Sequence, residues 1–204
     1  MYLRFFIGVF ALLTMTIAAC ERDYTDLRQR ELASGVRNDS IFMGLYFGMP
    51  RSAFYVHCHE MNQQGLVTNG TENISVLYMM SGYRQPIEVN FYPDFSEDKI
   101  YNMKVWMNYQ TWAPWNKEYY AERLVPDALA ILEKWYGSGF VKQRNQKGQP
   151  TWAKVNGNRE VILRILDERR LRVDITDISV QPKPNPSTAG QPTGPRPLWE
   201  KQAK

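Results

Sequence analysis

The chain has 204 residues, of which 44% are hydrophobic and 23% charged, and its formal net charge is +4 at pH 7. The charges are dispersed rather than gathered into a long basic run, so the electrostatic signature of a nucleic-acid-binding protein is missing. Residues 41–180 have a globular composition, and about 140 residues suffice for one hydrophobic core of ordinary size. We therefore expect a single domain over residues 41–180 and no nucleic-acid partner.

The first twenty residues have the organisation of a secretory signal. Arg4 supplies a positive charge, a short apolar run follows, and Ala18 and Ala19 precede Cys20. The apolar run has about 13 residues, whereas an ordinary membrane-spanning helix needs roughly 20. Three interpretations fit these residues: a cleaved and lipidated N-terminus, a cleaved secretory signal without lipid, and an uncleaved anchor.

The segment Ile17-Ala18-Ala19-Cys20 resembles the lipobox of bacterial lipoproteins. The resemblance implies that residues 1–19 are a signal peptide, that cleavage falls between Ala19 and Cys20, and that Cys20 is acylated, as by palmitate. The first expected partner is then a membrane of the cell envelope, reached through the N-terminal lipid. Glu21 follows the cysteine. Because the enteric sorting rule associates Asp at that position with inner-membrane retention, the resemblance favours the outer membrane.

Residues 20–40 are polar and carry charges of both signs. We expect the lipidated cysteine and a flexible tether here, which as a coil of about 20 residues would reach roughly 25 Å. Thr25 and Asp26 can cap a short helix that ends at Ala33. An isolated helix of that length is marginal in water, so the tether is expected to keep the domain clear of the lipid.

The first half of the domain reads as a strand, a helix and three further strands. The first strand is expected over Ile41–Phe47, and a helix from Pro50 to about Gln64, because proline suits the first turn of a helix. The helix should bury a face at the spacing of Phe54, Cys58 and Met61. The remaining strands are expected over Ile74–Met80, Ile87–Tyr92 and Ile100–Tyr109, with turns at Ser81-Gly82 and Pro93-Asp94.

The second half repeats this order. A helix is expected over Tyr119–Tyr136, in which Pro126 introduces a kink or starts a second helix. The Asn156-Gly157 dipeptide predicts a type I′ hairpin turn. Strands are expected over Phe140–Arg144, Trp152–Asn156, Arg159–Asp167 and Leu171–Ile178.

These elements predict an α+β fold, with helices packed on one face of an antiparallel sheet. The two helix-plus-meander halves share no residue-level identity, so duplication and a shared architecture without duplication both fit. Residues 181–204 are rich in Pro, Gly, Ser and Thr. That composition cannot build a core, which predicts a disordered tail.

The segment from Gly44 to Phe54 resembles the strand, Gly-Met and helix entry of small bacterial envelope lipoproteins of the SmpA/OmlA type. Those proteins usually have Ser or Thr after Gly-Met and an acidic residue three positions later, which together form a capping box. This chain has Pro50 and Ala53 at those positions. The resemblance implies a non-enzymatic attachment or assembly role, with no catalytic residues to assign.

The two histidines of the chain flank Cys58. Successive helical residues project about 100° apart, so His57 and His59 point in nearly opposite directions rather than toward one metal ion. Cys58 falls on the apolar stripe, where a small buried hydrophobe is the commoner role. We expect no metal, no cofactor and no catalytic residue. A small envelope enzyme that uses His57 or Cys58 is the alternative, and a pocket joining them to a third polar group would favour it.

The segment Tyr101–Tyr120 is dense in aromatic residues, since seven of its twenty residues are Tyr or Trp. Alternation along the strand assigns Tyr101 and Tyr109 to the core and Trp106 to the other face. Trp112 and Trp115 fall in a loop, where function is often located. Tryptophan is also a favoured anchor at interfaces.

Trp112 and Trp115 are therefore expected either to bind a partner or to cap the core. The carboxylate pairs Glu97-Asp98 and Asp167-Glu168 fall at predicted turns, where exposure to solvent explains them. Together these patterns predict a membrane-tethered, non-enzymatic lipoprotein that binds an envelope protein or a glycan.

Overall fold

The computed structural model describes residues 24–70, 75–145 and 147–183. The expected cleavage site at Ala19 and Cys20 and residues 184–204 of the expected tail lie outside these ranges. The helices are α2 (Arg51–Gln63), the short 3-10 helix η1 (Lys117–Tyr119) and α3 (Ala121–Tyr136), and residues 24–33 are also helical. None of the described helices combines the length and the apolar character that a membrane crossing requires.

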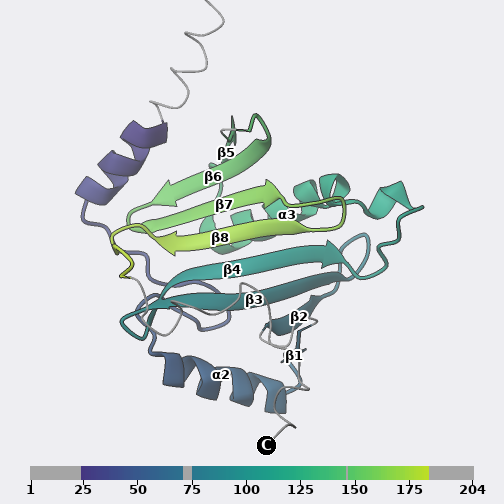
Figure 1. Ribbon diagram of the computed structural model, residues 1–204, viewed down its shortest axis with the longest axis horizontal. Helices are drawn as coiled ribbons and strands as arrows, with labels where there is room; N and C mark the ends of the chain where they lie inside the picture. The colour runs from purple at the N-terminus through teal and green to yellow at the C-terminus, as the bar shows by residue number, and fades with distance from the viewer. Residues whose placement is uncertain (1–23, 71–74, 146, 184–204) are drawn as a thin grey trace, which may run out of the picture.

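Eight strands form one antiparallel sheet in the order β1-β2-β3-β4-β8-β7-β6-β5 (Figure 1). Each half of the chain supplies a four-stranded meander, and the last strands of the two halves pair at the centre of the sheet. The α+β class is therefore confirmed, and the helix-plus-meander order occurs twice. The strands are β1 (Thr68–Asn69), β2 (Val76–Met80), β3 (Ile87–Ser96), β4 (Lys99–Tyr109), β5 (Val141–Arg144), β6 (Pro150–Asn156), β7 (Arg159–Ile165) and β8 (Leu171–Asp177).

One face of the sheet is apolar and covered. Four buried residues lie side by side in register across β3, β4, β8 and β7: Phe91, Val105, Val173 and Leu163. Helix α3 lies behind this face in Figure 1. The sequence predicts an apolar stripe on this helix, made of Leu124, Ala128, Ile131, Leu132 and Trp135. The first four are buried in the same hydrophobic cluster, as predicted, and Trp135 is partly buried against it. Pro126 lies within this continuous helix and starts no second one.

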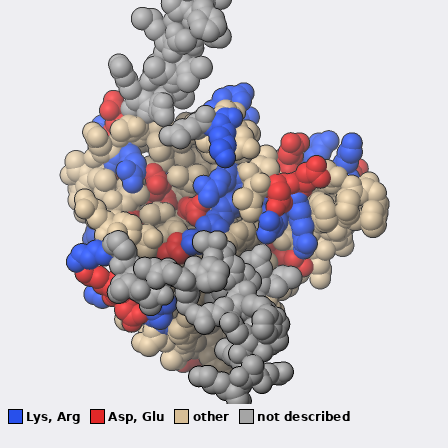
Figure 2. Space-filling model, viewed as in Figure 1, with Lys and Arg blue, Asp and Glu red and all other residues tan. Residues whose placement is uncertain are grey.

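The opposite face carries polar and charged side chains. Trp106, Arg172 and Arg164 are register neighbours across β4, β8 and β7. The Arg172 guanidinium lies 4.3 Å from the centre of the Trp106 ring, and both arginines bind Asp174. Lys, Arg, Asp and Glu side chains are interspersed where this face is visible in Figure 2. The predictions that Trp106 points away from the core and that Tyr109 is buried are confirmed.

Tyr101 is only half-buried, which corrects its assignment to the core. The register between β3 and β4 shifts at Asp94/Phe95, so that Phe95 pairs with Ile100. Such a bulge moves the following side chains to the other face. Ile100 is consequently the buried residue.

Residues 41–49 form a loop in which five side chains are buried, and the strand predicted over Ile41–Phe47 is wrong. The backbone N–H of Ile41 donates to the Leu45 carbonyl, and that of Leu45 donates to the Phe42 carbonyl, so the segment folds back on itself. Gly44 supplies a positive φ of 78°, which glycine adopts without steric cost. Phe42 packs between Phe91 and Trp135 at ring distances of 5.0 and 5.2 Å.

Two predicted turns are also corrected. Pro93 lies inside β3. Phe91 is the last residue of β3 that pairs with β2, so β3 has no partner on that side at Pro93, and an unpaired strand edge tolerates proline. The chain reverses instead at Glu97-Asp98. In the β6–β7 hairpin, Asn156 pairs with Arg159 and Gly157 is the first central residue, with φ 59°. A type I′ turn has a positive φ at both central residues, whereas a type II′ turn has one at the first central residue alone. This turn is therefore type II′ rather than the predicted type I′.

The predicted helix of α2 is confirmed, with Phe54 and Met61 buried and Cys58 packed partly against the same cluster. The segment before it differs from the expected flexible tether. Residues 24–33 are helical, and they contact the β6–β7 end of the sheet: Glu160 accepts hydrogen bonds from Tyr24 and Arg28, and the Gly157 N–H donates to Glu31. These long-range contacts stabilise a helix that would be marginal alone.

Candidate functional site

The two histidines that flank Cys58 contact different parts of the protein. His57 Nε2 lies 2.7 Å from the Met43 carbonyl oxygen, and His59 Nε2 lies 3.0 Å from the side-chain nitrogen of Gln63. Burial raises the pKa of the Cys58 thiol to about 12, the opposite of what a nucleophilic cysteine needs. Within the described ranges, no three His, Cys, Asp or Glu side chains are placed to share a metal ion.

Residues 110–116, which we call the tryptophan loop, connect β4 to η1. The backbone N–H of Trp112 donates to the Tyr109 carbonyl at 3.2 Å, and that of Asn116 donates to the Ala113 carbonyl at 2.9 Å. The Tyr120 hydroxyl donates to the Pro114 carbonyl at 2.6 Å. These bonds close the loop on itself, so it presents its side chains from a defined backbone.

The two tryptophans of this loop lie in different environments. Trp115 is 86% exposed, more than any other large hydrophobic side chain in the described part of the chain. Trp112 is half-buried, with its ring 6.3 Å from that of Tyr120 and 5.7 Å from the Arg169 guanidinium. Its indole N–H is buried and has no acceptor among the described residues. The sequence pattern does not distinguish the two residues, whereas in the structure Trp115 is much more accessible than Trp112.

The turn between β7 and β8 lies beside Trp112. Asp167 accepts hydrogen bonds from the backbone N–H groups of Arg169 and Arg170 and from the Arg170 side chain. Burial acts to raise the pKa of Asp167, but the hydrogen bonds from Arg170 and the backbone outweigh it and hold that pKa below its ordinary value. The Glu168 carbonyl accepts from the Ala121 N–H at 2.8 Å, which ties the turn to the start of α3.

The turn and the tryptophan loop enclose an open hollow of about 490 Å³, which we call the arginine hollow. Its lining residues are Trp112, Asp167, Glu168, Arg169 and Arg170. Arg170 is paired with Asp167 at 2.7 Å. Arg169 lies 3.8 Å from Glu88, longer than the usual charge-assisted hydrogen bond of about 2.7–2.9 Å. The Arg169 guanidinium is therefore the more available charge of the two.

The sequence does not predict the arginine hollow, although it indicates Trp112 and the Asp167-Glu168 pair as separate features. Asp167-Glu168 does lie in a turn, as expected. Its position beside the tryptophan loop follows from the pairing of β4 with β8, in which Met107 lies opposite Leu171. These residues are distant in the sequence, and no local pattern signals their contact.

The tryptophan loop and the N-terminal helical residues lie at opposite ends of the sheet (Figure 1). The loop follows the last residue of β4, whereas residues 24–33 contact the β6–β7 turn. The eleven residues of β4 span about 35 Å at the usual rise of an antiparallel strand. Trp115 is thus presented far from the segment that leads to Cys20.

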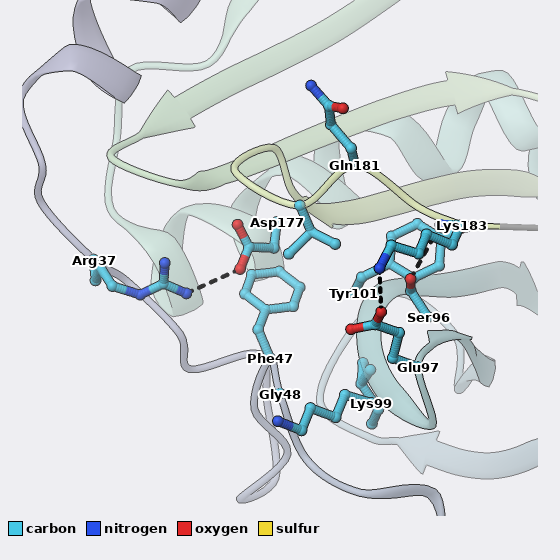
Figure 3. Close-up of a pocket in the computed structure, with 12 residues that line it drawn as sticks. Arg37, Phe47, Gly48, Ser96, Glu97, Lys99, Tyr101, Asp177, Gln181 and Lys183 are labelled. Atoms are coloured by element: carbon cyan, nitrogen blue, oxygen red, sulfur yellow. Dashed lines mark hydrogen bonds and ion pairs between the residues drawn. The ribbon is translucent and has the colours of Figure 1, made fainter.

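A second hollow of about 210 Å³ lies near the β3–β4 turn (Figure 3). Its charged side chains bind one another: Arg37 donates to Asp177 at 3.0 Å, and Lys183 binds Glu97. Lys99 is the remaining charged residue of its lining. Because its carboxylates are already paired within the chain, this hollow is the weaker candidate.

Comparison of the chain with protein-family models, curated proteins and solved structures gave no match.

Proposed function

We propose that this protein is a non-enzymatic lipoprotein of the cell envelope that binds a partner through Trp115. In this proposal Cys20 carries the lipid that attaches the protein to a membrane, which by the sorting resemblance is the outer membrane. The observation that carries the binding role is the 86% exposure of Trp115 on a loop closed by hydrogen bonds. An exposed aromatic side chain costs hydrophobic free energy in water unless something covers it.

The rigidity of the tryptophan loop supports this role. Binding requires side chains and loops to be ordered, and a surface that is already ordered loses less free energy on association. The backbone around Trp115 is fixed by the bonds at Pro114 and Asn116. Tryptophan is also among the residues that contribute most to binding when a partner buries them.

The position of the loop is consistent with a tethered binding protein. Residues 24–33 continue from the proposed lipid anchor and contact the β6–β7 end of the sheet. The tryptophan loop lies at the other end. A partner bound there would meet the protein away from its membrane attachment.

The competing enzyme hypothesis gains no support from the site geometry. Neither His57 nor Cys58 lines either of the two hollows described above. His57 contacts a backbone carbonyl, and burial disfavours the Cys58 thiolate. A nucleophile would need the reverse arrangement, with an adjacent base and a lowered pKa.

A crosslinking pull-down from native envelopes tests the proposed function. We expect a partner that is captured by the wild-type protein and lost with Trp115→Ala. The matched control is Tyr55→Ala, because Tyr55 is also an exposed aromatic residue, at 49%, on α2. Equal capture by the wild type and Trp115→Ala would contradict the assignment of Trp115 as the anchor.

A further inference from the structure

We propose that the partner is a glycan, with one sugar ring stacked on Trp115 and its neighbours hydrogen-bonded in the arginine hollow. This inference rests on the proposed function and specifies the chemistry of its partner. Trp115 is an exposed aromatic residue three positions after Trp112, which lines the charged, open hollow. Each of these features matches one part of a sugar.

A pyranose ring has an apolar face made of C–H groups and a rim of hydroxyl groups that both donate and accept hydrogen bonds. The negative face of an indole ring attracts the slightly positive C–H face. Carboxylates accept hydrogen bonds and guanidinium groups donate them. Glu168 is exposed and Arg169 is only distantly paired with Glu88. The arginine hollow therefore offers an acceptor and a donor to the hydroxyl rim.

The surroundings of Trp115 are less suitable for a protein interface. The core of such an interface is apolar and depleted of charged residues. Lys117 and Glu118 lie two and three positions after Trp115, and the hollow that Trp112 lines has four charged residues in its lining. Two other exposed large hydrophobic residues lie toward this end of the described sheet: Leu166, which is 45% exposed and follows β7, and Met79, which is 36% exposed and belongs to β2. Strands β3, β4 and β8 separate β2 from β7, so these side chains do not form one apolar patch of several hundred Å².

Trp112 adds a second point of recognition. Its indole N–H is buried without an acceptor, and a buried donor without a partner is unfavourable. The Arg169 guanidinium lies 5.7 Å from the ring, and its side chain is 44% exposed. If the Arg169 side chain turns toward a ligand in the hollow, a sugar oxygen can occupy the space that the guanidinium leaves. That oxygen can then accept a hydrogen bond from the indole N–H of Trp112.

The test is a binding titration of the full-length protein in dimethyldodecylamine oxide, a detergent without a sugar headgroup. The soluble probes are the tetrasaccharides chitotetraose, cellotetraose and maltotetraose. Purified peptidoglycan is the fourth probe, and its binding is measured in a sedimentation assay. We expect at least one probe to bind, and its affinity to fall at least about thirtyfold in Trp115→Ala. Trp115→Phe should recover part of this loss because it restores an aromatic face.

Glu168→Gln and Arg169→Gln should weaken binding of the same probe severalfold, whereas Tyr55→Ala should not change it. Unchanged unfolding midpoints would show that these variants are folded. Binding of none of the probes would overturn the glycan inference. If a protein is then captured in a Trp115-dependent manner, the proposed function stands with a different partner; if nothing is captured, both fall.

Discussion

Replacing Trp112 by phenylalanine should leave the stability of the protein nearly unchanged, although Trp112 is half-buried. The buried indole N–H lacks an acceptor, which costs about 1–3 kcal/mol, and phenylalanine removes that donor. The smaller ring forfeits roughly 50 Å² of apolar contact, or about 1 kcal/mol at 25 cal/mol per Å². The two effects have opposite signs, so the free energy of unfolding should change by no more than about 1–2 kcal/mol, in the stabilising direction if at all.

Replacing Trp112 by alanine should be more damaging. A tryptophan buries up to about 250 Å², and a half-buried one loses roughly 150 Å² on truncation, or about 4 kcal/mol. Removal of the unpaired N–H returns part of this, which leaves a net loss of about 1–3 kcal/mol. Trp115→Ala is the matched control, because Trp115 is 86% exposed and its truncation should change stability by less than about 1 kcal/mol.

Urea unfolding followed by circular dichroism measures all three variants on the purified protein. The expected order of stability places Trp112→Phe and Trp115→Ala beside the wild type and Trp112→Ala below them. Equal losses in Trp112→Phe and Trp112→Ala would refute the reasoning, because the indole N–H would then make a hydrogen bond that contributes to stability.

Three further predictions concern Cys20, Cys58 and Asp167. Cys20→Ala should abolish labelling by a fatty-acid probe and release the protein into the soluble fraction, and labelling that persists would exclude lipidation at this residue. Cys58 should react with a thiol reagent at least about a hundredfold more slowly in native than in denatured protein, because a thiol with a pKa of about 12 has little thiolate near neutral pH. The lowered pKa of Asp167 means that its stabilising contribution is complete above the unfolded-state value of about 3.9 and is lost as pH falls through the lower folded-state value. Stability of the wild type should therefore fall more steeply than that of Asp167→Asn below about pH 4, and parallel pH profiles would contradict this.

The regular elements could be predicted because local patterns dominate them. The alternation of Ile87, Val89 and Phe91 specified one buried face of β3, and those residues are fully buried. The stripe of α3 was likewise visible in the sequence and is buried as expected. In both cases the hydrophobic period and the final packing agree.

The segment 41–47 could not be predicted in the same way. Ile41, Phe42, Leu45 and Phe47 are buried, but Met43 and Gly44 have positive φ values and fold the chain into a loop. Phe42 then contacts Trp135, which is remote in the sequence. A run of apolar residues shows that a segment is buried and does not by itself decide its backbone conformation.

The candidate site was predicted only in part. A proline-containing loop pointed to Trp112 and Trp115, but the contrast between them depends on Tyr120 and Arg169. Arg169 reaches Trp112 only because β8 pairs with β4. The sequence could therefore indicate that the loop was unusual, whereas prediction of the charged hollow beside it requires the order of the strands in the sheet.

The most direct test of the proposed role of Trp115 is hydroxyl-radical footprinting of the protein in intact envelopes and after purification. Trp115 is 86% exposed and Tyr55 is 49% exposed in the protein alone, so both side chains should be oxidised rapidly in the purified sample. If a partner covers the tryptophan loop, oxidation of Trp115 should be severalfold slower in envelopes, while Tyr55 should react at the same rate in both. Equal oxidation of Trp115 in the two samples would show that nothing covers it and would contradict the binding role.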